Sequence, residues 1–308
     1  MESPRGSEWL HRLAMATAGA TFLLIIAGAL VVGHDAGLSV PDWPLSFGKF
    51  MPPMEGGVFY EHGHRMIAAL VAALTAVLAI WLWGAEVRKS IRWLGLAAFL
   101  AVILQAVLGG LTVLYLLPIP VLVAHACLAQ LFFCFTLSLA VYTSPACQSA
   151  SHPAIEDLRF PSFRHLSSVT TAGIFVQLIL GAARRHKALG LAPHLVWAGV
   201  LSVLILSLLF LALNRLPLAL RTLRSLSMTA AILLAVQLSL GFESYRARLA
   251  AQSVPQPDPS MIWITTAHVA VGALLLGVSL ILTLLAYREL AVPGKSLSFS
   301  QSPQKTLA

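Results

Sequence analysis

Eight apolar stretches, each close to the roughly 20 residues that a helix needs to cross a bilayer, constrain the fold of this chain more than any other feature. They lie at 13–33, 65–84, 93–115, 121–142, 165–183, 194–213, 225–244 and 262–287. Only 10% of the residues are charged, compared with about 25% in a typical soluble domain. The apolar–polar alternation of membrane strands does not appear. We therefore predict an all-α integral membrane protein with eight transmembrane helices.

The basic residues indicate how these helices are oriented. An even number of spans places both termini on one side, and thirteen of the 20 Lys and Arg residues fall on that side. Cytoplasmic loops carry the excess of such residues. We therefore expect a multi-pass protein of the cell (inner or plasma) membrane with both termini in the cytoplasm. This topology explains the net charge of +8, so no nucleic-acid partner is expected.

Four histidines stand near the beginnings of alternate apolar stretches: His64, His125, His194 and His268. These stretches all enter the membrane from the outer side, so the four imidazoles are expected at one depth, toward the outer face. An ionisable residue within the bilayer indicates a functional site, imidazole ligates haem iron, and helix bundles hold cofactors between facing helices. We predict that each half of the chain ligates one haem through two histidines. Four hydrogen-bonded structural histidines are the alternative.

A repeated Q-x-x-L-G motif indicates two related halves. It occurs at Gln105–Gly109, Gln177–Gly181 and Gln237–Gly241. We predict two parallel four-helix units, 1–150 and 151–308, related by a pseudo-twofold axis along the membrane normal. Gln and Gly at positions i and i+4 share one helix face. That face fits either the wall of a porphyrin slot or a close helix contact with an interhelical hydrogen bond.

The two units differ at their outer ends. The first has E-x-x-H-R at Glu61–Arg65, at the mouth of its second span, and a long loop from about His34 to Tyr60. The corresponding loop of the second unit, Arg184 to Pro193, is short. Long loops in compact proteins are commonly lids or binding loops. We therefore expect a substrate and catalytic site in the first unit and a cofactor site in the second.

These motifs resemble those of the haem A synthase family, over nearly all eight predicted spans. The motifs that carry the resemblance are G-L-S-x-x-D-W-P at Gly37–Pro44, E-x-x-H-R at Glu61–Arg65, L-G-G-L-T-V at Leu108–Val113, Ala124-His125 with Gln130, His194 and His268. The resemblance implies oxidation of the methyl group on carbon 8 of haem O to a formyl, through hydroxylated intermediates. The product, haem A, serves cytochrome oxidase assembly.

The resemblance also implies a role for each site residue. His64 and His125 would ligate the substrate haem, while His194 and His268 would ligate a haem B cofactor that passes electrons. Glu61 is the expected catalytic residue, relaying a proton or stabilising positive charge near the reacting carbon. Pairing with Arg65, or capping of the helix N-terminus, is the alternative for Glu61. Residues expected to support these groups are Arg65, Gln105, Gln177, Gln237, Asp42 and Trp43.

The implied partners are haem O as substrate, an electron donor that the sequence leaves unidentified, and, as candidates, haem O synthase and cytochrome oxidase assembly factors. A homo-oligomer is compatible with the sequence. The chain departs from the family in having no cysteine pair in its outer loops, and in having Val32-Gly33-His34 where an arginine usually follows glycine. Its cysteines, Cys127, Cys134 and Cys147, predict no disulfide. Two other functions stay open: a di-haem b-type electron-transfer protein, and a haem-handling chaperone or transporter.

Overall fold

The computed structural model describes residues 4–148, 155–157, 161–251 and 258–291. Within these residues, eight long helices are each apolar enough to cross a membrane: α1 Pro4–Gly33, α2 Gly56–Ala85, α3 Lys89–Leu114, α4 Ile119–Thr143, α6 Phe163–Arg185, α7 Ala192–Arg215, α8 Arg221–Ala250 and α9 Pro259–Glu289. Two short helices, α5 (Pro145–Gln148) and the 3-10 helix η1 (Leu218–Leu220), lie between them. The prediction of an all-α multi-pass membrane protein is confirmed.

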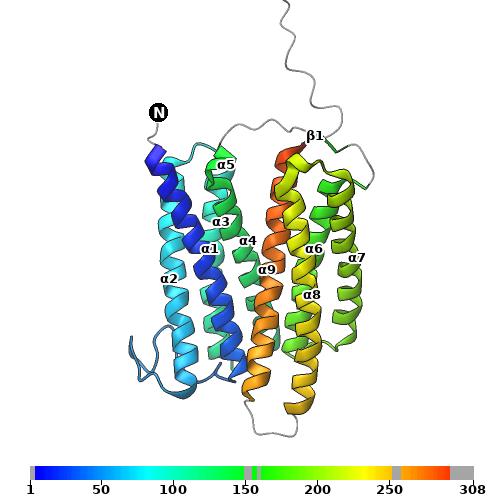
Figure 1. The fold of residues 1–308 in the computed structure, drawn as a ribbon. Coiled ribbons are helices and arrows are strands. Elements are labelled where there is room, and N and C mark those ends of the chain that lie inside the picture. Colours follow the sequence, from blue (N-terminus) through cyan, green and yellow to red (C-terminus); the bar gives the residue numbers. More distant parts are fainter. Residues whose placement is uncertain (1–3, 149–154, 158–160, 252–257, 292–308) are drawn as a thin grey trace, which may run out of the picture.

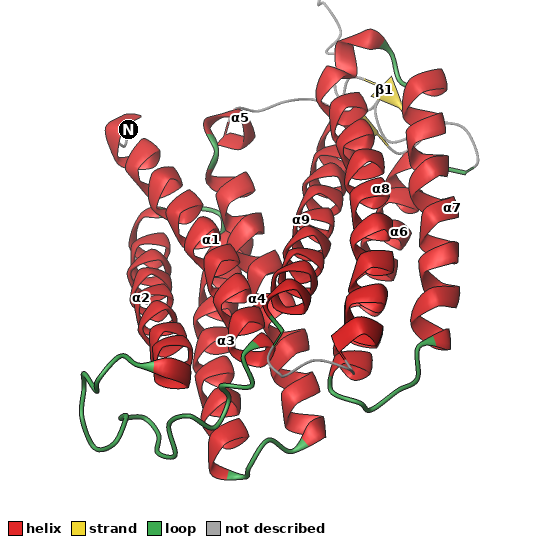
Figure 2. Ribbon diagram, turned by 60° about the horizontal axis from the view of Figure 1, so that its bottom comes forward, coloured by secondary structure: helices red, strands yellow, loops and turns green. Residues whose placement is uncertain are grey.

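The long helices run side by side as one bundle. Helices α1 to α4 form one side of it and α6 to α9 the other (Figures 1 and 2). Helix α9 packs against α1, α4, α6 and α8, and α4 also packs against α6, so α4 and α9 join the two sides. The beginning of α1 and the end of α9 lie at the same end of the bundle (Figure 1). The unit boundaries and the pseudo-twofold axis stay predictions.

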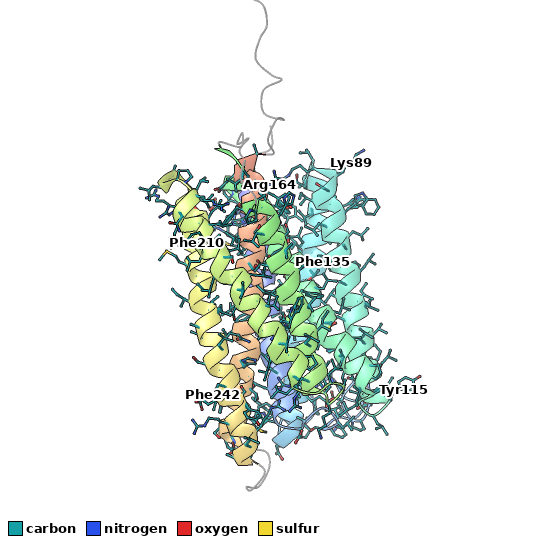
Figure 3. All side chains as sticks on the ribbon, turned by 90° about the vertical axis from the view of Figure 1, so that its right-hand side faces the viewer. Lys89, Tyr115, Phe135, Arg164, Phe210 and Phe242 are labelled. Atoms are coloured by element: carbon teal, nitrogen blue, oxygen red, sulfur yellow. The ribbon has the colours of Figure 1, made fainter. Side chains whose placement is uncertain are left out.

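The outer surface of the bundle is apolar along its length. Side chains such as Phe210 and Phe242, each 61% exposed, project outward from the helices (Figure 3). The fully buried positions are instead filled by residues such as Leu78 and Leu276. So large an apolar surface would be an aggregation liability in water, whereas in lipid it is the required exterior, because the helices satisfy their own backbone groups.

Several helices extend beyond the apolar stretches that predicted them. Helix α2 begins at Gly56, soon after Pro52 and Pro53, so Glu61–Arg65 lies within its first turns and not at its mouth. Hydropathy marks only the part of a helix that faces lipid, and polar turns continue the same helix outside it. A strand pair, β1 (Ile155–Glu156) beside β2 (Leu290–Ala291), was not predicted. Two residues are too few for a strand pattern.

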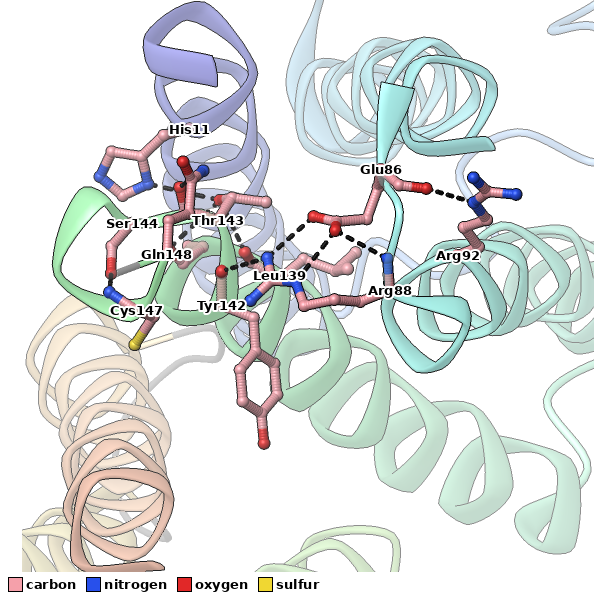
Figure 4. A network of polar contacts seen from close by, with 11 residues as sticks. His11, Glu86, Arg88, Arg92, Leu139, Tyr142, Thr143, Ser144, Cys147 and Gln148 are labelled. Carbon is pink, nitrogen blue, oxygen red and sulfur yellow. Dashed lines mark hydrogen bonds and ion pairs between the residues drawn. The ribbon is translucent and has the colours of Figure 1, made fainter. Parts of the chain in front are cut away.

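A polar network fastens the helices at the end of the bundle opposite the four histidines (Figure 4). Glu86, in the turn between α2 and α3, pairs with Arg88 at 2.8 Å. Arg88 also donates to the Tyr142 carbonyl of α4 at 2.9 Å. The Arg88 guanidinium holds the pKa of the Glu86 carboxyl below its ordinary value. The α2–α3 turn is thereby tied to α4.

Candidate functional site

The second histidine pair is formed by His194, in the first turn of α7, and His268, in the third turn of α9. Their ring centroids lie 6.4 Å apart, with the ring planes at 68°. Two imidazoles that share one metal, at metal–nitrogen distances of about 2 Å, have centroids roughly 6 Å apart. Within the described residues no cluster of three or more His, Cys, Asp or Glu is arranged for a metal ion. The separation of the two rings therefore suits two imidazoles that share one metal ion.

Each of the four histidine rings packs against a glycine of the preceding long helix. A Cβ built on the glycine would lie only 3.2–3.3 Å from the Cε1 of the ring, in the pairs Gly28–His64, Gly109–His125, Gly181–His194 and Gly241–His268. Three of these glycines are the last residue of a Q-x-x-L-G motif. The motif glycine thus provides the close approach that each imidazole needs, and the fourth glycine, in α1, was missed because no glutamine precedes it.

The glutamines of the motif bond to the helix that carries the histidine. Gln105 Nε2 donates to the His125 carbonyl at 2.9 Å, and Gln177 Nε2 donates to the His194 carbonyl at 3.0 Å. Gln237 Nε2 lies 3.4 Å from His268 Nε2. The interhelical hydrogen bond that we considered as one interpretation is therefore present. In α1 the equivalent position, four residues before the glycine, is the apolar Leu24.

The Nδ1 atoms of all four imidazoles are buried and have no hydrogen-bond partner in the described structure: His64, His125, His194 and His268 share this feature. Leaving a buried polar atom unpaired costs about 1–3 kcal/mol. Neutral imidazole in an apolar setting is the commonest metal ligand in proteins. The glycine cradles and the unused ring nitrogens thus fit a bound metal macrocycle.

In the first half, His64 and His125 lie within electrostatic range of each other.

Glu61 and Arg65 fasten the long loop between α1 and α2 to α2. Glu61 is only 4% exposed. Its Oε1 accepts from Arg65 at 2.6 Å and its Oε2 accepts from the Val40 backbone N–H at 2.8 Å. Arg65 also donates to the carbonyls of Asp42 at 2.7 Å and Leu45 at 2.9 Å. The pairing considered as the alternative for Glu61 therefore exists, and it places a buried carboxylate one turn before His64.

The loop closes on itself through Asp42. Its carboxylate accepts from the backbone N–H groups of Phe47 at 2.7 Å and Gly48 at 2.8 Å. Both donors have positive φ, 55° and 68°, as the two central residues of a tight hairpin turn require. The hydrogen bonds from Gly48 and Phe47 hold the pKa of Asp42 below its ordinary value. Their contribution is therefore complete at neutral pH and is lost as the pH falls through that lowered pKa.

Trp43 places the loop over α3. A Cβ on Gly110 would lie 2.7 Å from the indole Cδ2, so the ring rests directly on this glycine. Gly110 follows Gly109, whose face meets His125. The loop therefore packs on the first half of the chain, beside the first histidine pair.

Sequence reasoning assigned no role to two other histidines that hold this loop. His62 is buried, and its Nδ1 lies 2.8 Å from the Ser46 hydroxyl. His34 stacks on Tyr60, with ring centroids 3.6 Å apart. Neither contact follows from hydropathy, because each joins α2 to the preceding loop, whose path depends on tertiary structure.

Residues 55–196 match a protein family described as cytochrome oxidase assembly protein. Similar proteins include the Heme A synthases of Symbiobacterium thermophilum, 32% identical over 136 residues, and of Ruegeria pomeroyi, 34% identical over 134 residues. The Heme A synthase of Bacillus pumilus is 29% identical over 143 residues. The chain is thus similar to proteins named Heme A synthase over part of its length.

The similarity is concentrated in part of the molecule. The alignments cover 43%, 39% and 46% of this chain and 44%, 33% and 47% of the three relatives, so less than half of each relative is matched. The family match contains His64, His125 and His194, together with the E-x-x-H-R motif. His268 lies beyond it, and what supports its assignment is its geometry opposite His194.

Proposed function

We propose that this protein is a haem A synthase, oxidising the carbon 8 methyl group of haem O to the formyl of haem A for cytochrome oxidase assembly. The observation that carries the proposal is the histidine pair 6.4 Å apart, whose glycine cradle recurs at the histidines of the other half. The similarity to proteins named Heme A synthase supports the reaction. The long fastened loop that the described residues place beside the first pair supports assigning the reacting site to that half.

In this proposal the two halves divide the work. His64 and His125 ligate the substrate haem in the unit 1–150. His194 and His268 ligate haem B in the unit 151–308, where the cofactor supplies one-electron chemistry. The four glycines let the helices approach their imidazoles, and Gln105, Gln177 and Gln237 fix the histidine-bearing helices. Trp43 and Asp42 keep the loop over the substrate side and exclude water from it.

Glu61 is proposed as the catalytic residue. It is buried, it lies three residues before His64, and its partners are one guanidinium and one backbone N–H. A carboxylate so placed can hold or pass a proton, or stabilise positive charge that develops near the oxidised carbon. Arg65 then positions Glu61 and the loop together.

The proposed setting follows from topology and from the reaction. We place both termini in the cytoplasm and the histidine pairs toward the outer face of the cell membrane, because basic residues are in excess on the side of the termini. The reaction needs haem O and an electron donor. Haem O synthase, oxidase assembly factors and a second copy of the chain are the partners to be tested.

The test is to express the full chain in a host that makes haem O but no haem A, and to identify extracted haems by mass. We expect haem A or hydroxylated haem O together with haem B. His64→Ala is the matched control, since it should retain haem B and yield only haem O. Haem B with unmodified haem O from the wild-type chain would contradict the synthase and favour an electron-transfer or haem-handling protein.

A further inference from the structure

Three arginines gather beside the second histidine pair: Arg184 and Arg185 at the end of α6, and Arg248 near the end of α8. Arg248 is close enough to repel the charges of both Arg184 and Arg185. The charges of Arg185 and Arg248 act on His268, and that of Arg184 acts on His194. The cluster therefore lies at the outer end of the pair, in reach of whatever the two imidazoles hold.

The charges of this cluster are not neutralised within the described part of the chain. The ion pairs found there belong to Arg12, Arg65, Arg88 and Arg246. Arg185 donates to the Ala29 carbonyl of α1 at 2.8 Å, while its Nε is buried and has no hydrogen-bond partner. The adjoining sequence 252–257 contains no Asp or Glu. Like charges held together near a membrane are costly unless an anion joins them.

We propose, building on the haem site proposed above, that Arg184, Arg185 and Arg248 bind the propionate carboxylates of the haem held by His194 and His268. Guanidinium groups bind carboxylates through paired, charge-assisted hydrogen bonds. Haem carries its two carboxylates on one edge, so axial ligation at the histidines directs that edge toward one end of the bundle. The arginine cluster would determine which end of the bundle the carboxylate edge of the haem faces.

Arg65, whose charge acts on His64 of the first pair, differs from these three arginines. That guanidinium is already bonded to Glu61 and to the carbonyls of Asp42 and Leu45. Its charge is paired with Glu61, and both of its terminal nitrogens already donate hydrogen bonds. We therefore expect the second site, where the arginine charges have no ion-pair partner in the described residues, to prefer porphyrins that carry free carboxylates.

The test compares iron protoporphyrin IX with its dimethyl ester, which has the same ring and iron but no carboxylate charge. Haem-depleted full-length chain carrying His64→Ala, so that the first pair is disabled, is titrated with each in non-ionic detergent. We expect the free acid to bind about tenfold more tightly than the ester. Arg185→Gln and Arg248→Gln should each reduce that preference to about threefold or less.

Two control variants make the result specific. Arg246→Gln removes an exposed cation of α8 that already pairs with Glu243 at 3.3 Å, and it should keep the full preference. Arg185→Lys keeps the positive charge and should retain part of the preference for the free acid. Equal binding of acid and ester by the parent chain, or a preference that survives both glutamine variants, would overturn the proposal while leaving the haem site intact. Absence of a bis-imidazole spectrum with either porphyrin would instead contradict the proposed haem site and this inference together.

Discussion

At the scale of single residues, four glycines determine how closely each histidine approaches the preceding helix. Gly241→Val should displace the His268 ring, because even a Cβ at this position would lie 3.2 Å from Cε1. Overpacking of this kind costs about 1–3 kcal/mol, so haem affinity at the second site should fall about tenfold. The control is Gly199→Val in α7, where nothing lies within 4 Å of the added Cβ. The bis-imidazole absorbance of purified protein measures both, and equal retention would contradict the cradle.

A substitution of Glu61 distinguishes a catalytic role of this residue from a structural one. Glu61→Gln keeps the acceptor for the Val40 N–H but removes the charge and the titratable proton. As a catalytic group, Glu61 should be worth about a hundredfold or more in rate, so haem A should be lost while haem B stays on His194 and His268. As a structural group it is the buried partner of Arg65, so its loss should lower stability and loosen the loop, with haem A still formed. Near-normal haem A yield would defeat the catalytic role.

A matched substitution and a second readout keep these explanations apart. Glu8→Gln removes the exposed pair with Arg12 and should change neither haem. If Glu61→Gln lost haem A only because the loop came free, trypsin would cleave it faster after Lys49. A cleavage rate within about twofold of wild type would exclude that explanation, and much faster cleavage would support it.

At the scale of elements, the loop between α1 and α2 is held by Glu61–Arg65 at one side and by Trp43 at the other. Trp43→Ala removes the indole that rests on Gly110. Burying an aromatic side chain contributes about 1.5–3 kcal/mol. Because Trp43 is 39% exposed, we expect the lower part of that range and about tenfold faster tryptic cleavage after Lys49. Leu38→Ala, at 42% exposure in the same loop, should change the rate little. Equal rates in the two variants would show that Trp43 does not hold the loop.

At the scale of the whole molecule, the two histidine pairs should act as separate haem sites. His194→Ala and His268→Ala each remove one imidazole of the second pair, so each should weaken or abolish haem B retention and leave the first pair intact. Measurement of haem per chain and of the low-spin spectrum tests this. An unchanged low-spin spectrum in both variants would contradict the assignment.

The sequence was sufficient to predict the eight helices, because lipid requires long apolar segments and few other chains contain them. It also singled out the four histidines, since their side chains are costly within a bilayer, and their role as haem ligands stays a prediction. It did not reveal Gly28, whose helix lacks the motif glutamine, or His62, whose partner Ser46 lies in a loop. The cluster of Arg184, Arg185 and Arg248 was hidden for another reason. In the sequence, these arginines only indicated which way the helices cross the membrane. Their proximity to one another appears only once the helix ends are packed together.

Under the proposed function, Leu24 has a kinetic consequence. A synthase must release each product and take up new substrate, whereas its cofactor has to remain through many cycles. Three histidine-bearing helices have a glutamine bonded to them or beside the imidazole, but in α1 the position four residues before Gly28 holds the apolar Leu24. A missing hydrogen bond of about 1 kcal/mol shortens a lifetime roughly fivefold. The replacement of a glutamine by Leu24 in α1 would thus shorten the residence time of haem at the first pair relative to the second.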